Sequence, residues 1–464
     1  MLFNSYIFVF LFFPVSLAGY WLCGKAAEKK GRSFLPSLFL VAASLLFYGY
    51  LKPAYLPVLL VSLLVNFAFY RQIEKRKEKK AFLAGGIFLD LLVLGIFKYT
   101  GSTFVPLGIS FFTFSQIAFL VEGYRGSLKR TSLLDYSVYL TFFPKIMEGP
   151  IALPTDFLSA YQESGKKGFS IENLYRGLTL FILGLSKKVL LADTLGKAVD
   201  FGYSNLSVLN TPDALIVMLS YTLQLYFDFS GYSDMAIGLG QAFGFTFKEN
   251  FNYPYIAQTM QEFWRRWHIS LSTWFREYVY IPLGGNRVSK TKWLRNILVV
   301  WLLTGLWHGA AWNFVLWGLY FFVLLCIERL LRNGLSRIPK PVRHLVTLVL
   351  ILFSWNIFYH TDLTRLLESF RILFGLSGSG FTNETTNLLL RNNLPLLLVC
   401  AVGCTAIPQF TGNVIGLLCA EKRDDGVGHK VYAALTFVFD LALLALATIS
   451  LAGSSYNAFL YFRF

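Results

Sequence analysis

The chain has 464 residues, of which 55% are hydrophobic and only 15% are charged. A soluble protein of this length could not bury so much apolar surface, so the composition excludes a water-soluble enzyme and indicates an all-α integral membrane protein. The formal net charge of +16 would favour nucleic-acid binding in a soluble chain. Here the cations stand mainly between apolar segments, as the positive-inside rule describes, and we expect no nucleic-acid partner.

Apolar windows long enough to cross a hydrocarbon core of about 30 Å recur along the whole chain. The first window is interpreted as a retained span, because no Lys or Arg precedes it and no clear Ala-x-Ala site follows it. Basic clusters at 25–32 and 71–80 follow the first and third windows, which predicts an N-terminus outside. Together the windows predict about ten or more spans, some short or broken, at 3–22, 34–50, 54–70, 81–97, 176–193, 213–227, 293–328, 345–359, 394–408 and 431–453.

The stretch 101–175 differs from the four windows before it. Its apolar pieces are short and are interrupted by glycine and proline, for example at Pro106, Gly108, Pro144 and Pro150. Such backbone is tolerated at membrane depth only where protein buries it or a wet cavity faces it. We therefore expect broken or re-entrant helices here, with a functional cavity and close helix packing both left open.

Two carboxylates interrupt the apolar and aromatic run that follows. Burying the carboxylates of Asp228 and Asp234 inside a membrane costs free energy unless they face a polar interior. One interpretation is that they orient groups in a cavity. The other is that they form structural ion pairs, for example with Arg265 or Arg266.

Residues 261–287 fit one amphipathic helix. Its aromatic residues, including Trp264, Trp267 and Trp274, share a stripe, while Arg265, Arg266 and Arg276 spread over the other faces. The pattern predicts an interfacial helix, too charged to span. Its cations could bind anionic membrane lipid or a phosphorylated acyl donor at the cytoplasmic side.

His308 is the strongest candidate for chemistry. It stands in an apolar run from Ile297 to Ile327 that contains no Asp, Glu, Lys or Arg, and the length of this run predicts a bend around Gly305–Asn313. A desolvated imidazole stays neutral and can accept a proton, and the glycines at 305 and 309 would leave room for a substrate beside the ring. The alternative is a core histidine bonded to a carbonyl. For His268, which lies at the edge of the aromatic stripe, a structural role is the stronger alternative.

Three motifs together resemble the core of the membrane-bound O-acyltransferases. They are Glu262–Ser272, Tyr280–Arg287 and Leu306–Trp312, with supporting pieces at 106–114, 143–151, 184–189 and 227–234. The similarity extends over most of residues 1–464, including the aromatic tail 459–462, and is greatest to the bacterial alginate and peptidoglycan O-acetylation branch. One departure is the late segment Trp355–His360, where relatives often carry an arginine.

The resemblance implies a fold, a reaction and a location. The fold is a single polytopic domain over 1–464, with N-terminal spans (1–100), a catalytic core (101–330) and C-terminal spans (331–464), forming a helical ring with re-entrant and interfacial helices. His308 would be the catalytic base and His268 its neighbour. Asn313, Asp228, Asp234, Arg265, Arg266 and Arg276 would line the cavity or bind the donor. The resemblance also implies that the protein lies in a bacterial inner (cytoplasmic) membrane.

The expected reaction moves acetyl from acetyl-CoA, with no tightly bound cofactor and no metal, to an exported polysaccharide through an extracytoplasmic partner protein. A D-alanyl transferase for teichoic acid is the alternative within the family. A proton-coupled secondary transporter, with His308 and the aspartates as relays, is the alternative from another class.

Overall fold

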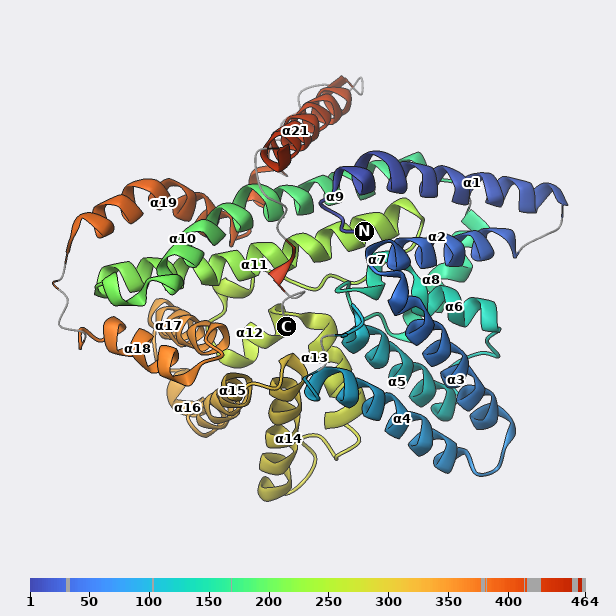
Figure 1. Ribbon diagram of the computed structural model, residues 1–464, viewed down its shortest axis with the longest axis horizontal. Coiled ribbons are helices and arrows are strands. Elements are labelled where there is room, and N and C mark those ends of the chain that lie inside the picture. The colour runs from blue at the N-terminus through green and yellow to red at the C-terminus, as the bar shows by residue number, and fades with distance from the viewer. Residues whose placement is uncertain are drawn as a thin grey trace. The chain divides into compact units, whose positions relative to one another are not determined.

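A computed structural model shows a chain built of helices (Figure 1). It describes residues 1–30, 34–101, 104–167, 169–376, 380, 382–412, 414, 427–452 and 458–460, and within these ranges there is no β-strand. This confirms the all-α prediction. Part of the aromatic tail, 461–462, lies outside the described residues.

Within the described ranges, seven helices are long and apolar enough to cross a membrane. The chain is therefore a multi-pass membrane protein, although the sequence suggested more spans. The windows at 176–193 and 213–227 lie in other, less uniformly apolar helices, and the window at 34–50 forms a shorter apolar helix. The seven are Phe8–Glu28, Pro53–Lys75, Lys79–Tyr99, Trp312–Leu330, Lys340–Tyr359, Glu384–Gly403 and Lys430–Ala452.

The chain folds into two compact units, each assembled from separate stretches. Unit 1 contains Met1–Gly184, Tyr232–Glu249 and Ser270–Leu283, and unit 2 contains Leu185–Gly231, Asn250–Ile269 and Gly284–Phe464. The units do not coincide with the segments 1–100, 101–330 and 331–464, and a single functional domain stays a prediction.

Unit 1 begins with four long helices, of which all but α2 are among the seven of spanning length, and continues with shorter ones. Its elements are η1 (Phe8–Phe12), α1 (Phe13–Lys30), α2 (Leu35–Leu51), η2 (Pro53–Tyr55), α3 (Leu56–Lys75), α4 (Lys79–Tyr99), α5 (Ile109–Arg125), α6 (Leu133–Thr141), α7 (Phe143–Ile146), α8 (Pro154–Lys167), most of α9 (Ile171–Ser186), most of α13 (Ile269–Phe275) and η6 (Arg276–Tyr280). The short helices α5 to α8 confirm that 101–175 is broken.

The helices α3, α4 and α5 lie side by side in unit 1 (Figure 1). A hydrogen bond of 2.6 Å from Asn66 Nδ2 to Asp90 Oδ1 joins α3 to α4, and both residues are buried. Hydrocarbon offers polar groups no partner. The bond therefore gives each of these side chains one partner inside the protein, although Asn66 Oδ1 and Asp90 Oδ2 have none among the described residues.

Unit 2 contains η3 (Lys187–Ala192), α10 (Asp193–Ser204), η4 (Leu206–Val208), the first part of α11 (Thr211–Ala242), η5 (Pro254–Ile256), α12 (Met260–Arg266), α14 (Lys290–His308), α15 (Trp312–Leu330), α16 (Arg332–Leu335), α17 (Lys340–Tyr359), α18 (Leu363–Leu373), α19 (Glu384–Gly403) and α21 (Val427–Ala452). The expected break in the run 293–328 is confirmed, because α14 ends at His308 and α15 begins at Trp312.

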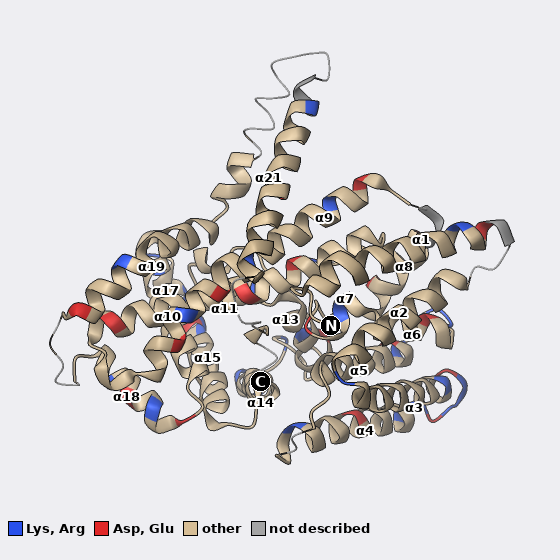
Figure 2. Cartoon of the chain, turned by 45° about the horizontal axis from the view of Figure 1, so that its top comes forward, with Lys and Arg blue, Asp and Glu red and all other residues tan. Residues whose placement is uncertain are grey.

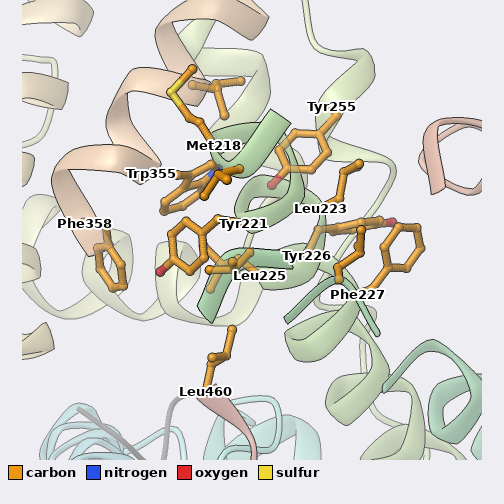
Figure 3. Close-up of a cluster of buried hydrophobic side chains, with 14 of the residues drawn as sticks. Met218, Tyr221, Leu223, Leu225, Tyr226, Phe227, Tyr255, Trp355, Phe358 and Leu460 are labelled. Atoms are coloured by element: carbon orange, nitrogen blue, oxygen red, sulfur yellow. The ribbon is translucent and has the colours of Figure 1, made fainter. Parts of the chain in front are cut away.

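The core of unit 2 is a cluster of buried aliphatic and aromatic side chains (Figure 3). Tyr221 and Leu225 of α11, Trp355 and Phe358 of α17, and Leu460 near the end of the chain belong to it. The C-terminal segment is therefore part of the packed interior of this unit.

A buried ion pair fixes that segment. Lys188 Nζ lies 2.6 Å from Asp228 Oδ1 and 2.8 Å from Asp193 Oδ1, and it donates to the carbonyl of Ala458 at 3.1 Å. The backbone N–H of Leu460 donates to the other Asp228 oxygen at 3.0 Å. Asp228 is thus a structural ion-paired group, as one interpretation proposed, but its partner is Lys188 and not Arg265 or Arg266.

Charged residues elsewhere gather at helix ends and in connecting segments, and the helix bodies are largely free of them (Figure 2). The link between α3 and α4 is an example, with Lys75, Arg76, Lys77 and Lys79 in close succession. This distribution agrees with the positive-inside interpretation of the sequence.

We predict that Lys188→Met destabilises the protein by about 3–5 kcal/mol, because it leaves the Asp228 carboxylate buried without its cation. Both side chains are only 2% exposed. Thermal unfolding of the purified protein in micelles measures the effect.

The matched control is Lys248→Met. Lys248 pairs with Asp156 at the same distance of 2.6 Å, but the two side chains are 82% and 45% exposed. The free energy of unfolding should therefore fall by less than about 1 kcal/mol. Equal decreases in the free energy of unfolding of the two variants would contradict a stabilising role for the buried Lys188–Asp228 pair.

Candidate functional site

His308 is the last residue of α14 and its ring is enclosed by aromatic side chains. The residue is 4% exposed. Its ring centroid lies 5.0 Å from that of Phe358, 5.1 Å from Trp317 and 4.7 Å from Trp307. Gly309, in extended conformation, ends the helix there. The imidazole is thus held at a helix break, in surroundings that exclude water.

Asn313 fixes one wall of this enclosure from the first turn of α15. Its Nδ2 donates to the backbone carbonyls of Phe358 at 2.8 Å and Ile357 at 3.3 Å, at the end of α17. Because Phe358 lies edge-on to the His308 ring, Asn313 acts on the site by positioning its neighbours.

The glycines beside His308 serve helix packing and not substrate access. A Cβ atom at Gly305 would meet the carbonyl oxygen of Phe314, one at Gly309 would meet the Phe314 ring, and one at Gly318 would meet the carbonyl oxygen of Trp301. The expectation of open space beside the imidazole is therefore wrong. Helix α15 fills this space. Two helices can approach this closely only where small residues face each other, and the glycines allow that approach.

His268 belongs to the same unit and lies in the same neighbourhood. Its ring centroid is 6.2 Å from that of Trp307, which in turn contacts His308, and 4.7 Å from Phe229. The residue is 1% exposed. Burial lowers the pKa of its imidazole to about 3, so the ring is neutral at physiological pH.

Asn250 determines which nitrogen of His268 carries the proton. Asn250 Oδ1 lies 3.2 Å from His268 Nδ1, and an amide oxygen can only accept, so Nδ1–H is the donor. The neutral ring then has its lone pair on Nε2, which is buried and has no hydrogen-bond partner among the described residues. Sequence reasoning missed Asn250, because nothing in its local pattern connects it to a histidine eighteen positions later.

His268 also marks a sharp break in the chain. It has φ +44, a left-handed conformation that non-glycine residues rarely adopt. The single interfacial helix expected over 261–287 is therefore wrong: α12 ends at Arg266, and α13 begins at Ile269. The strained backbone persists because Ile269 N–H donates to the Asn250 carbonyl and Asn252 N–H donates to the Arg266 carbonyl, both at 2.9 Å.

The break separates the aromatic residues that were expected to share one stripe. Trp264 packs on Trp301 at 4.7 Å and Trp267 on Trp355 at 4.8 Å, all in unit 2. Trp274 stacks on Phe114 at 3.9 Å in unit 1.

The three candidate arginines differ in their surroundings. Arg266 pairs with Glu262 at 2.9 Å, and Arg276 pairs with Glu277 at 2.7 Å. Arg265 is exposed. Arg276 and the half-buried Asp234 belong to unit 1, whereas Arg265, Arg266, Asn313, Asp228 and both histidines belong to unit 2.

His360, which directly follows α17, is buried. It is 4% exposed and its ring lies 4.6 Å from that of Tyr203. Its position just after α17 gave no hint of this, because Tyr203 comes from the distant helix α10.

Comparison with known proteins identifies similar chains. Residues 36–370 match the MBOAT, membrane-bound O-acyltransferase family. The chain is 32% identical to a peptidoglycan O-acetyltransferase of Helicobacter pylori, over 100% of this chain and 98% of that protein. It is 33% identical to a probable alginate O-acetylase AlgI of Azotobacter vinelandii, over 100% of both. A teichoic acid D-alanyltransferase of Bacillus subtilis is 32% identical over 47% of this chain and 58% of its own.

We predict that Gly305→Ala destabilises the protein by about 1–3 kcal/mol, because the added methyl group pushes α14 from α15. The comparison is Gly95→Ala in α4, where a Cβ meets nothing within 4 Å and alanine should stabilise the helix by up to about 1 kcal/mol. The midpoints of thermal unfolding should move in opposite directions. Shifts of the same sign would refute the packing role of Gly305.

Proposed function

This chain belongs to the membrane-bound O-acyltransferase family, and on that premise we propose that it transfers acetyl from cytoplasmic acetyl-CoA across the membrane for O-acetylation of an exported cell-surface polysaccharide. The observation that carries the proposal is the pair of buried histidines, His268 and His308, both of which lie near Trp307. The full-length similarity to peptidoglycan and alginate O-acetylating proteins supports acetyl as the group transferred.

His308 is the general base of this reaction. It takes the proton from the acceptor hydroxyl while the oxygen attacks the thioester carbonyl, and collapse of the adduct expels the thiolate of CoA, which is then protonated. The aromatic enclosure shields this imidazole from bulk water.

His268 positions a reacting group through Nε2. Because Asn250 holds the proton on Nδ1, Nε2 can accept a hydrogen bond from the acceptor hydroxyl or from an N–H of the donor. A charged imidazole could also polarise the thioester carbonyl. His268 cannot take this second role, because its low pKa keeps the ring neutral.

Arg265 and Arg266 attract the phosphates of the donor at the cytoplasmic side. The exposed Arg265 is the better placed of the two to bind a phosphate directly. Arg266 would first have to leave its carboxylate partner Glu262.

The chain lies in a bacterial inner membrane with its N-terminus outside. The basic clusters after α1 and α3 support this orientation. An extracytoplasmic partner protein completes transfer to the polymer, because the segments that connect the described helices are too short to hold a polysaccharide.

The histidines are tested in cells that produce the protein, with the O-acetyl content of cell-surface glycans measured by mass spectrometry. We expect His308→Ala to lower acetylation by roughly 10²- to 10⁴-fold, because the general base is lost. The control is His344→Ala, a histidine bound only to the Ala257 carbonyl at 3.1 Å within the described residues. Unchanged acetylation in His308→Ala at equal protein level would exclude the base assignment.

The same cells separate the competing functions. Loss of D-alanine esters from teichoic acid in His308→Ala would favour the D-alanyl transferase, whose relative matches less of the chain. Loss of solute transport without any change in glycan acylation would favour a transporter.

Asn250→Leu tests the tautomer of His268. Losing one neutral hydrogen bond should lower kcat/KM about tenfold, because Nε2 then no longer holds the reacting group in place. Asn250→Gln, which keeps an amide oxygen, should recover part of the rate. Full activity in Asn250→Leu would show that the proton position on His268 is unimportant.

A further inference from the structure

Unit 1 carries an apolar groove outside the candidate site. Its volume is about 540 Å³, within the range of small-molecule sites. One face of α1, from Phe13 to Lys25, forms one wall, and Phe169, Leu174 and Leu178 in and before α9 form the other. Leu22 of this groove is 65% exposed, so the groove opens to the outside of the unit.

The groove has the length of one membrane leaflet. From Phe13 to Lys25 the helix rises about 18 Å at 1.5 Å per residue, and half of a hydrocarbon core is about 15 Å. Both residues belong to the candidate span Phe8–Glu28. A flexible apolar chain lying parallel to α1 would match the groove along its whole length.

One end of the groove is polar, and the rest is not. Lys25, at the end that the basic cluster places in the cytoplasm, has an exposed side chain that forms no ion pair within the described residues. One turn above it, Trp21 Nε1 is buried and donates to nothing among the described residues. The exposed cation of Lys25 at the headgroup level is a donor suited to a phosphate, whereas the buried indole N–H is closed to a ligand.

We propose that this groove binds one anionic phospholipid of the cytoplasmic leaflet, with an acyl chain along α1 and the phosphate on Lys25. The charge at one end and the apolar length together specify this occupant. A protein helix would need a wider surface, and a zwitterionic lipid would leave the charge of Lys25 only partly compensated. The site is independent of the proposed acyl transfer.

The test uses the full-length protein in micelles of a neutral detergent, titrated with phosphatidylglycerol or phosphatidylcholine and examined by native mass spectrometry. We expect one phosphatidylglycerol to bind more tightly than phosphatidylcholine. Lys25→Gln should weaken phosphatidylglycerol binding about fivefold, the effect of one lysine near an anionic lipid. Ala18→Phe, which fills the groove, should weaken both lipids.

The matched control is Lys75→Gln, an exposed lysine in the last turn of α3 outside the groove. It should leave the affinity for phosphatidylglycerol unchanged. The proposal is overturned if Lys25→Gln and Lys75→Gln weaken binding equally, which would indicate unspecific charge attraction. It is also overturned if the two lipids bind wild type equally, or if Ala18→Phe keeps full binding while its unfolding midpoint matches wild type.

Discussion

Hydrocarbon offers no hydrogen-bond partners, so each polar side chain inside this protein must find its partner within the chain. The Lys188–Asp228 pair satisfies this constraint and also ties the C-terminal segment to α11. The Asn66–Asp90 bond and the Asn313 bonds to the end of α17 follow the same rule. The buried Nε2 of His268 is one of several buried polar atoms without a partner among the described residues, and among these we single it out because it belongs to a neutral imidazole close to Trp307 and His308.

Much of the architecture could be predicted from the sequence. Composition alone indicates a helical membrane protein, and the length of the run 293–328 requires a break, which the structure places at Gly309–Ala311. Glycine and proline predicted the short helices between 101 and 175. The motifs around His268 and His308 indicated the family before any comparison, because they combine residue types that apolar helices rarely contain.

The remaining features depend on contacts that leave no local trace. Helical periodicity continues through Trp267 and His268, so the break there became visible only through the positive φ of His268. Lys188 and Asp228 are forty positions apart, and a nearer arginine was the natural first choice of partner. Glycine beside a histidine is ambiguous in sequence: the residue that leaves room for a substrate also leaves room for a neighbouring helix.

The central claim is that His268 and His308 together form the site of acyl transfer. A cryo-electron microscopy structure of the full chain with a thioether analogue of acetyl-CoA, which cannot transfer its acyl group, tests it most directly. The account predicts that the acyl group of the analogue lies against both imidazoles, with its carbonyl carbon open to attack by a hydroxyl that His308 would deprotonate. An ordered analogue whose carbonyl contacts neither imidazole would contradict it.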